Sequence, residues 1–155
     1  MPHIRPYQAE DRAAVERVFY RAVREGTAAH YTQAERAAWA PSPEPDLTRP
    51  DKLLTQWCHV AQDDGQITGF FSMDHTGYLD MAFVIPEVMG NGTAAALYDT
   101  VMARARAEGL THFTVRAAVQ SHRFLARRGW VLDRMTTFTE DGETYTAALL
   151  TLDLP

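Results

Sequence analysis

A short segment with two glycines has the residue types and spacing that most directly suggest chemistry. Met89-Gly90-Asn91-Gly92-Thr93-Ala94 follows an apolar run and precedes a stretch with helical spacing. The first amides of a helix lack partners within the helix and carry the positive end of its dipole, so this position favours an anion. Gly90 and Gly92 allow close approach of a ligand, and Asn91 tolerates a left-handed backbone. We expect a phosphate or pyrophosphate here, although two glycines also suit a plain strand-to-helix turn.

Two common phosphate-binding classes fit this loop poorly. Gly90-x-Gly92-x-x-Ala95 formally matches the dinucleotide fingerprint, and Arg116 stands where a partner for a 2′-phosphate would be. However, three antiparallel strands are expected before the loop, and only one strand-helix unit and a hairpin after it, so two mononucleotide-binding halves cannot be built. No Gly-Lys-Ser/Thr triplet follows the glycines, which excludes a P-loop.

Asp80 is the second candidate for chemistry, because it is an acid within the otherwise apolar run 79–85. A carboxylate shielded from water there would hold a proton more readily, as a general base for an ammonium substrate must. The alternative is a structural aspartate near a strand end that binds backbone amides. His75 in the adjoining turn is another candidate base. Tyr78 is a candidate proton donor, although an aromatic residue at that spacing is more often part of a core.

The elements that must position these residues follow from the spacing of apolar side chains. Helices are expected from Asp11 to Gly26, from Thr32 to Trp39, between Gly92 and Gly109, and from Gln120 to Arg128. Asp11 is the expected N-cap of the first helix, and Thr32 and Glu35 form a capping box for the second. Strands are expected at residues 3–6, 57–62, 67–73, 78–85, 112–119, 130–138 and 145–152.

The order of these elements predicts a fold. The strands 57–62, 67–73 and 78–85 follow one another and predict an antiparallel meander. The run 78–85, the helix after it and the strand 112–119 form a right-handed β-α-β unit with parallel strands. A hairpin follows near the C-terminus. We expect one domain, residues 1–155, of the α/β (α+β) class, with a mixed, mostly antiparallel sheet of about seven strands and helices on both faces.

The composition argues against several function classes. The 155 residues include 15 Lys and Arg and 20 Asp and Glu, a net charge of −5, without the basic face that binding to nucleic acid or to an anionic membrane needs. The single cysteine, Cys58, cannot form an intramolecular disulfide, and no Cys/His spacing suggests a metal site. We expect a cytoplasmic protein without a metal, a nucleic-acid partner or a membrane anchor.

Several segments together resemble the GNAT superfamily of acetyl-CoA-dependent N-acyltransferases. That family has the pattern Gln/Arg-x-x-Gly-x-Gly/Ala after a central strand, and here it is Met89-x-x-Gly92-x-Ala94. Ile4-Arg5-Pro6 and the helix after it are similar to the family's first strand and helix. Phe124-Leu125-Ala126-Arg127-Arg128-Gly129-Trp130 is similar to its aromatic-x-x-x-x-Gly-Phe signature. The resemblance implies a single GNAT-like domain whose fourth and fifth strands, 78–85 and 112–119, splay apart.

The resemblance also implies roles for residues of this sequence. The backbone of Ala82, Phe83 and Val84 would pair with the pantetheine arm of acetyl-CoA. Asp80 would be the general base, and Tyr78 would replace the family's proton donor. Acetyl-CoA is further expected at Met89, Gly90, Asn91, Gly92, Thr93, Ala94 and Phe124, and the acceptor at Tyr31 and Trp39.

Three positions depart from the family pattern. Met89 replaces a Gln or Arg, Ala118 replaces an Asn or Ser, and Leu125 replaces the tyrosine that protonates the leaving thiolate. The expected function is transfer of an acetyl group from acetyl-CoA to the amine of a small molecule, by direct attack in a ternary complex. An acyl-CoA-binding or sensor protein with little turnover is an alternative, and a protein N-terminal or lysine acetyltransferase is another. A homodimer through the edge of the C-terminal hairpin is also expected.

Overall fold

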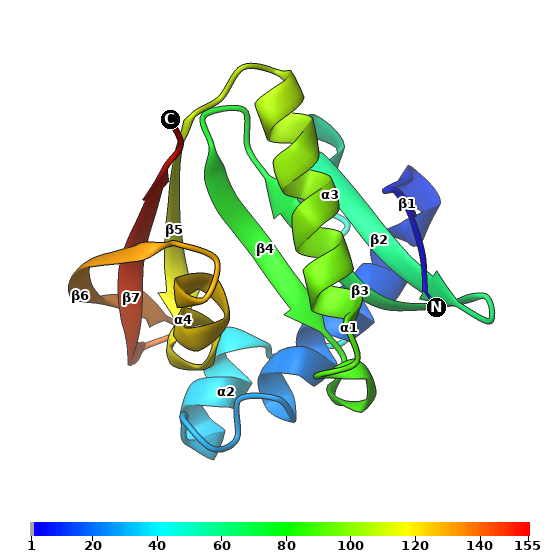
Figure 1. The fold of residues 1–155 in the computed structure, drawn as a ribbon. Coiled ribbons are helices and arrows are strands. Elements are labelled where there is room, and N and C mark those ends of the chain that lie inside the picture. Colours follow the sequence, from blue (N-terminus) through cyan, green and yellow to red (C-terminus); the bar gives the residue numbers. More distant parts are fainter. Residues whose placement is uncertain (1) are drawn as a thin grey trace.

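The computed structural model describes residues 2–155, which form one α/β unit (Figure 1). The strands are β1 (His3–Pro6), β2 (Trp57–Asp63), β3 (Gln66–Met73), β4 (Tyr78–Val84), β5 (His112–Ala118), β6 (Val131–Glu140) and β7 (Glu143–Asp153). The helices are α1 (Arg12–Arg24), α2 (Gln33–Trp39), α3 (Thr93–Ala107) and α4 (Val119–Ala126), with short 3₁₀ turns η1 (Ala9–Asp11), η2 (Lys52–Thr55) and η3 (Pro86–Val88). These bounds agree closely with those expected from the sequence.

All seven strands belong to one sheet, in the order β1-β2-β3-β4-β5-β7-β6. Neighbouring strands are antiparallel except β4 and β5, which are parallel. The expected fold class, a mixed and mostly antiparallel sheet with helices on both faces, is therefore confirmed. Positive φ angles at Asp64, Gly65, Asp141 and Gly142 fit tight hairpin turns between β2 and β3 and between β6 and β7.

The splay between β4 and β5 is the feature of the sheet that matters most for function. These strands pair at only two positions, Tyr78 with Thr114 and Leu79 with Val115. By contrast, β5 pairs with β7 along its whole length, from His112 to Ala118. Beyond Leu79 the two strands diverge toward their C-terminal ends (Figure 1). The central pair of the sheet is thus open on the side where α3 begins.

Two groups of apolar side chains hold the helices against opposite faces of the sheet. Leu97, Val101 and Ala105 of α3 follow helical spacing and are buried in a cluster with residues from β2 to β5 and β7. On the other face, Val15 and Val18 of α1 pack into a second cluster. Figure 1 shows α3 crossing the near face of the sheet and α1 lying behind it. None of the helices in residues 2–155 has the length and hydropathy to cross a bilayer.

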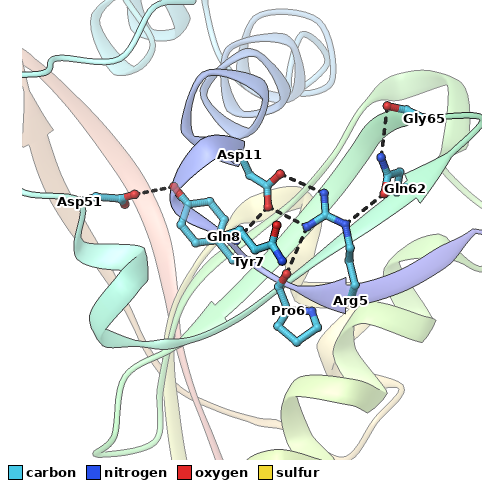
Figure 2. Close-up of polar contacts among 8 residues, drawn as sticks. All are labelled: Arg5, Pro6, Tyr7, Gln8, Asp11, Asp51, Gln62 and Gly65. Atoms are coloured by element: carbon cyan, nitrogen blue, oxygen red, sulfur yellow. Dashed lines mark hydrogen bonds and ion pairs between the residues drawn. The ribbon is translucent and has the colours of Figure 1, made fainter.

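The start of α1 is fixed by an ion pair instead of by the expected N-cap. Arg5 donates to both carboxylate oxygens of Asp11, at 2.8 and 2.9 Å, and the amide of Gln8 donates to Asp11 Oδ2 at 2.8 Å (Figure 2). The prediction that the Asp11 side chain caps α1 is therefore wrong. Its carboxylate accepts hydrogen bonds from Arg5 and from the Gln8 amide, and it makes none with the amides of α1. The capping box of Thr32 and Glu35 at α2 is confirmed by both of its hydrogen bonds.

Candidate active site

The glycine loop before α3 presents free backbone amides. Gly90 and Gly92 have φ angles of 79° and 95°, in the left-handed region. Asn91, which could tolerate such a backbone, does not adopt it. Its side chain instead accepts hydrogen bonds from the backbone and the hydroxyl of Thr93, at 3.0 and 2.7 Å. The amides of Gly90, Gly92 and residues 94 and 95 have no hydrogen-bond partner within residues 2–155, which leaves them available for an anion.

A cavity of about 620 Å³ passes through the splay between β4 and β5. One end is formed by the glycine loop and α4, and its lining there comprises Met89, Gly90, Ala94, Gln120, Ser121, Phe124 and Leu125. The other end lies on the α1 and α2 side of the sheet, and its lining there comprises Phe19, Trp39, Arg49, Lys52, Asp80, Phe83, Arg116, Phe138 and Glu140. The two ends therefore differ in chemistry: the first has amide donors, and the second has aromatic and charged side chains.

Asp80 lies at the second end of this cavity, on a bulge of β4. The register between β3 and β4 runs from Ser72–Met81 to Met73–Leu79, so Asp80 has no partner across the ladder. A bulge re-aims side chains and is common next to active sites. The carboxylate is not alone among apolar side chains, as the sequence suggested. Lys52 Nζ and Gln56 Nε2 each lie 2.9 Å from Asp80 Oδ2.

This arrangement leaves one oxygen of Asp80 free. Both contacts go to Oδ2, and no donor from the described part of the chain reaches Oδ1. The side chain is mostly buried, at 18% exposure. Lys52 and Gln56 therefore fix the carboxylate in place, and Oδ1 remains able to accept a hydrogen bond from a ligand in the cavity.

Tyr78 also lines the cavity, at the last point where β4 and β5 pair. Burial raises the pKa of its hydroxyl, and so does the charge of Asp80, whereas the charge and the backbone amide of Arg116 lower it. Because the net shift is upward, the phenol stays protonated at neutral pH and can donate its proton.

Most of the residues that the sequence indicated for cofactor binding line the cavity: Ala82, Phe83, Val84, Met89, Gly90, Ala94 and Phe124. Asn91 and Gly92 lie on the exposed loop beside it, and Thr93 is buried at the start of α3. Of the two residues expected at the acceptor, Trp39 lines the cavity. Tyr31 lies outside the lining. Its hydroxyl donates to the Thr146 carbonyl at 2.9 Å and accepts from the Val119 amide at 3.2 Å.

Other candidates from the sequence lie away from this site. His75 packs against Trp57, with ring centroids 4.6 Å apart, outside the cavity lining. Cys58 is buried, and burial raises the pKa of its thiol to about 12, so the thiol is inert at neutral pH. Across residues 2–155, no three His, Cys, Asp or Glu side chains come together in a way that could hold a metal ion.

The structure adds residues that sequence reasoning missed. Gln120 and Ser121 precede Phe124 and Leu125 by one helical turn, so the spacing along α4 could have placed all four at the cavity. Lys52 and Phe138 come from segments far from Asp80 in the sequence, and only the tertiary fold brings them to the same cavity.

Comparisons with known proteins agree with this geometry. Residues 27–148 match the family model described as an acetyltransferase (GNAT) domain. Over 128 residues the chain is 32% identical to YafP of Escherichia coli K12, an uncharacterised N-acetyltransferase. The matched region covers 82% of this chain and 79% of that protein. The chain belongs to the GNAT family. It is therefore an acetyltransferase by membership, and the family that the sequence resembled is confirmed.

Solved structures extend the likeness of this GNAT domain to its full length. A GCN5-related N-acetyltransferase from Rhodopseudomonas palustris superposes with a TM-score of 0.93 at 28% identity, covering 99% of this chain and 96% of the other. The PaiA N-acetyltransferase from Thermoplasma acidophilum, solved with coenzyme A, has a TM-score of 0.77 at 14% identity and covers 99% of both chains. The second likeness bears on the fold of this GNAT domain alone.

Proposed function

We propose that this chain transfers an acetyl group from acetyl-CoA to the amine of a small molecule, by direct attack in a ternary complex. One observation carries the proposal: a single cavity runs through the splay from the free amides of the glycine loop to the carboxylate of Asp80. A donor and an acceptor can therefore meet from opposite faces of the sheet, without a covalent intermediate on the protein.

The glycine-loop end suits acetyl-CoA. The amides of Gly90, Gly92 and residues 94 and 95, together with the dipole of α3, suit a pyrophosphate. Met89 adds no charge where the family pattern has Gln or Arg, so these amides carry more of the binding. The backbone of β4 beyond Leu79 has no partner on β5. It is therefore free to pair with the pantetheine arm and to donate an N–H to the thioester oxygen. The coenzyme A bound by the Thermoplasma protein supports the same donor here.

The other end supplies the acid and the base. Asp80 Oδ1 accepts the proton that the acceptor's ammonium must lose. The amine then attacks the thioester carbonyl, the C–N bond forms and the C–S bond breaks. The departing thiolate takes a proton, for which the Tyr78 hydroxyl is the proposed source. The attacking nitrogen loses its second proton to water as the amide forms, and a proton from water restores the Tyr78 hydroxyl. General acid and base catalysis of this kind contributes roughly 10²- to 10⁴-fold each.

The first test is titration with acetyl-CoA in a calorimeter, followed by thiol release over a panel of amines. Asp80→Asn should lower the rate of thiol release roughly 10²-fold or more, with acetyl-CoA affinity unchanged, because Asp80 lies at the acceptor end. Asp99→Asn, an exposed position on α3, is the matched control and should keep the wild-type rate. No binding at millimolar acetyl-CoA would overturn the proposal.

A second candidate is an acyl-CoA-binding or sensor protein with little turnover. Leu125 and Met89 favour it, because both remove polar groups that the family pattern has at these positions. Acetyl-CoA binding without thiol release on any amine, and with no effect of Asp80→Asn, would support this candidate over the enzyme.

A protein N-terminus or lysine as acceptor is less well supported. It would need an open groove between Tyr31 and the C-terminal hairpin. Tyr31 instead hydrogen-bonds Thr146 on β7, and Trp39 packs edge-on against Phe138 of β6, with ring centroids 6.0 Å apart. These contacts narrow the acceptor end and favour a small molecule.

A further inference from the structure

We infer that the acceptor is a zwitterion, an amine that also carries a carboxylate beside an apolar side chain, and that Arg116 binds the carboxylate. The inference rests on the proposed function, because it concerns the acceptor end of the same cavity. It names the class of substrate that the family match leaves open.

Arg116 is a positioned cation without an anion. It lies on β5 and lines the cavity, and its Cζ atom is 4.5 Å from the centroid of the Phe138 ring. An aromatic face holds a guanidinium in place by a cation–π contact and leaves its N–H groups free. No carboxylate in residues 2–155 lies within 4.0 Å of the Arg116 nitrogens. A guanidinium in this state is a ready partner for a carboxylate, which it can bind through two parallel hydrogen bonds.

The other two cations at this end are already paired with an opposite charge, and the one acid left over is Glu140. Lys52 is neutralised by Asp80 at 2.9 Å, and Arg49 pairs with Asp46 at 3.4 Å on the surface. Glu140, at the end of β6, is exposed, as is Arg116. The cavity therefore has three cations and two acids in its lining, and Arg116 is the cation that has no carboxylate.

This balance changes what the net charge of the chain suggests about the acceptor. The overall charge of −5 permits a purely cationic amine, but such an amine would meet the like charge of Arg116 as it approached Asp80. A zwitterion places its ammonium at Asp80 and its carboxylate at Arg116. Asp80 and Arg116 lie on the neighbouring strands β4 and β5 and line the same cavity, so a small molecule seated between these strands can contact both.

The aromatic part of the cavity lining determines whether the acceptor's side chain is polar or apolar. Phe19, Trp39 and Phe83 pack edge to face, with ring centroids 5.0 to 6.4 Å apart. These rings line the cavity and offer no hydrogen bond donor other than the Trp39 indole. An apolar side chain is therefore favoured, and an α-amino acid such as phenylalanine, leucine or methionine has all three features.

The test compares each of these amino acids with the amine that lacks its carboxylate: phenethylamine, 3-methylbutylamine and 3-(methylthio)propylamine. Thiol release at saturating acetyl-CoA gives kcat/KM for each pair. The wild type should favour the amino acid by roughly 10- to 100-fold, the range for a hydrogen bond between charged groups. Arg116→Gln should bring the ratio within each pair close to one. Arg123→Gln, on α4 outside the cavity lining, should keep the wild-type ratio.

Equal or better use of the decarboxylated amines by the wild type would overturn the inference, and so would an Arg116→Gln variant that keeps the preference. If no amine of either kind is turned over, calorimetry at saturating coenzyme A decides instead. The N-acetylated amino acids should then bind more tightly than the N-acetylated amines, and only when Arg116 is present. Failure of the proposed function is distinct, because it is the absence of acetyl-CoA binding or of thiol release with every amine, whereas the inference concerns only the preference for a carboxylate.

Discussion

Two residues that carry a hydroxyl group line the cavity, Tyr78 and Ser121. Tyr78→Phe should lower kcat about tenfold or more while the KM for acetyl-CoA changes little, because the phenol is needed only as the C–S bond breaks. Steady-state thiol release across pH measures this. Ser121→Ala is the matched variant, since it removes the other hydroxyl. An unchanged kcat in Tyr78→Phe together with a reduced kcat in Ser121→Ala would make Ser121 the proton donor and contradict the assignment to Tyr78.

Individual site residues differed in how well the sequence predicted them. Asp80 could be found because an acid stands out in an apolar run. Its partners could not: Gln56 lies 24 positions away, and no local pattern connects Lys52 with β4. Arg116 drew attention only as part of a dinucleotide fingerprint that the fold excludes. Its place in the same cavity as Asp80 depends on β5 lying beside β4, which is a property of the sheet.

Among the secondary-structure elements, the start of α1 makes a prediction about stability. The hydrogen bond from Arg5 is the main cause that holds the pKa of Asp11 below its ordinary value. A lowered folded-state pKa stabilises the fold above the unfolded value of about 3.9, and this stability is lost as pH falls through the folded-state pKa. Asp11→Asn should therefore lower the free energy of unfolding at pH 7 by about 1–3 kcal/mol, as measured by urea denaturation.

The difference between wild type and Asp11→Asn should shrink as the pH is lowered below about 4. The control is Glu108→Gln, which removes an exposed ion pair with Arg104 one turn earlier on α3. That variant should change stability by less than about 0.5 kcal/mol. A pH-independent deficit in Asp11→Asn would mean that lost packing, and not the ion pair, accounts for the effect.

Elements were predicted best where local chemistry alone decides them. Helical spacing, Gly-containing turns and the Thr32–Glu35 capping box act within a few residues, so the bounds of strands and helices could be expected closely. The prediction that the Asp11 side chain caps α1 was wrong because it considered only local residues. A cap assignment weighs only the amides that follow, whereas Arg5, on the strand before the helix, binds the same carboxylate. Likewise, the bulge at Asp80 depends on the pairing partner β3 and has no signal in β4 itself.

For the molecule as a whole, we still predict a homodimer through the C-terminal hairpin. β6 is the last strand of the sheet, and it exposes Val131, Leu132 and Met135 at 64%, 42% and 50%. An apolar edge strand of this kind is open to pairing with another chain. Light scattering should give twice the mass of one chain, and Met135→Glu should shift it toward the monomer. Leu47→Glu, at an exposed position outside the sheet, is the control. A monomeric wild type at high concentration would contradict the prediction.

The overall architecture could be predicted because nearly every segment of the sequence resembled one family, including the splay that no local pattern encodes. The contacts that narrow the acceptor end of the cavity could not be predicted from the sequence. They depend on Tyr31 reaching Thr146, 115 positions away, and on Trp39 meeting Phe138. The sequence therefore indicated Tyr31 and Trp39 for the acceptor end, but it gave no sign of the charged lining on which the proposed zwitterion depends.

The two paired positions between β4 and β5 also bear on how the protein holds together. The sheet is continuous in topology, yet the halves formed by β1–β4 and by β5–β7 share very few main-chain bonds across the splay. A ligand whose amide groups hydrogen-bond to the free edge of β4 would replace the main-chain hydrogen bonds that β5 does not make there. Binding would then add to unfolding cooperativity as well as to affinity, because a group bound only in the native state stabilises it by mass action. The donor substrate would serve this sheet as a removable strand.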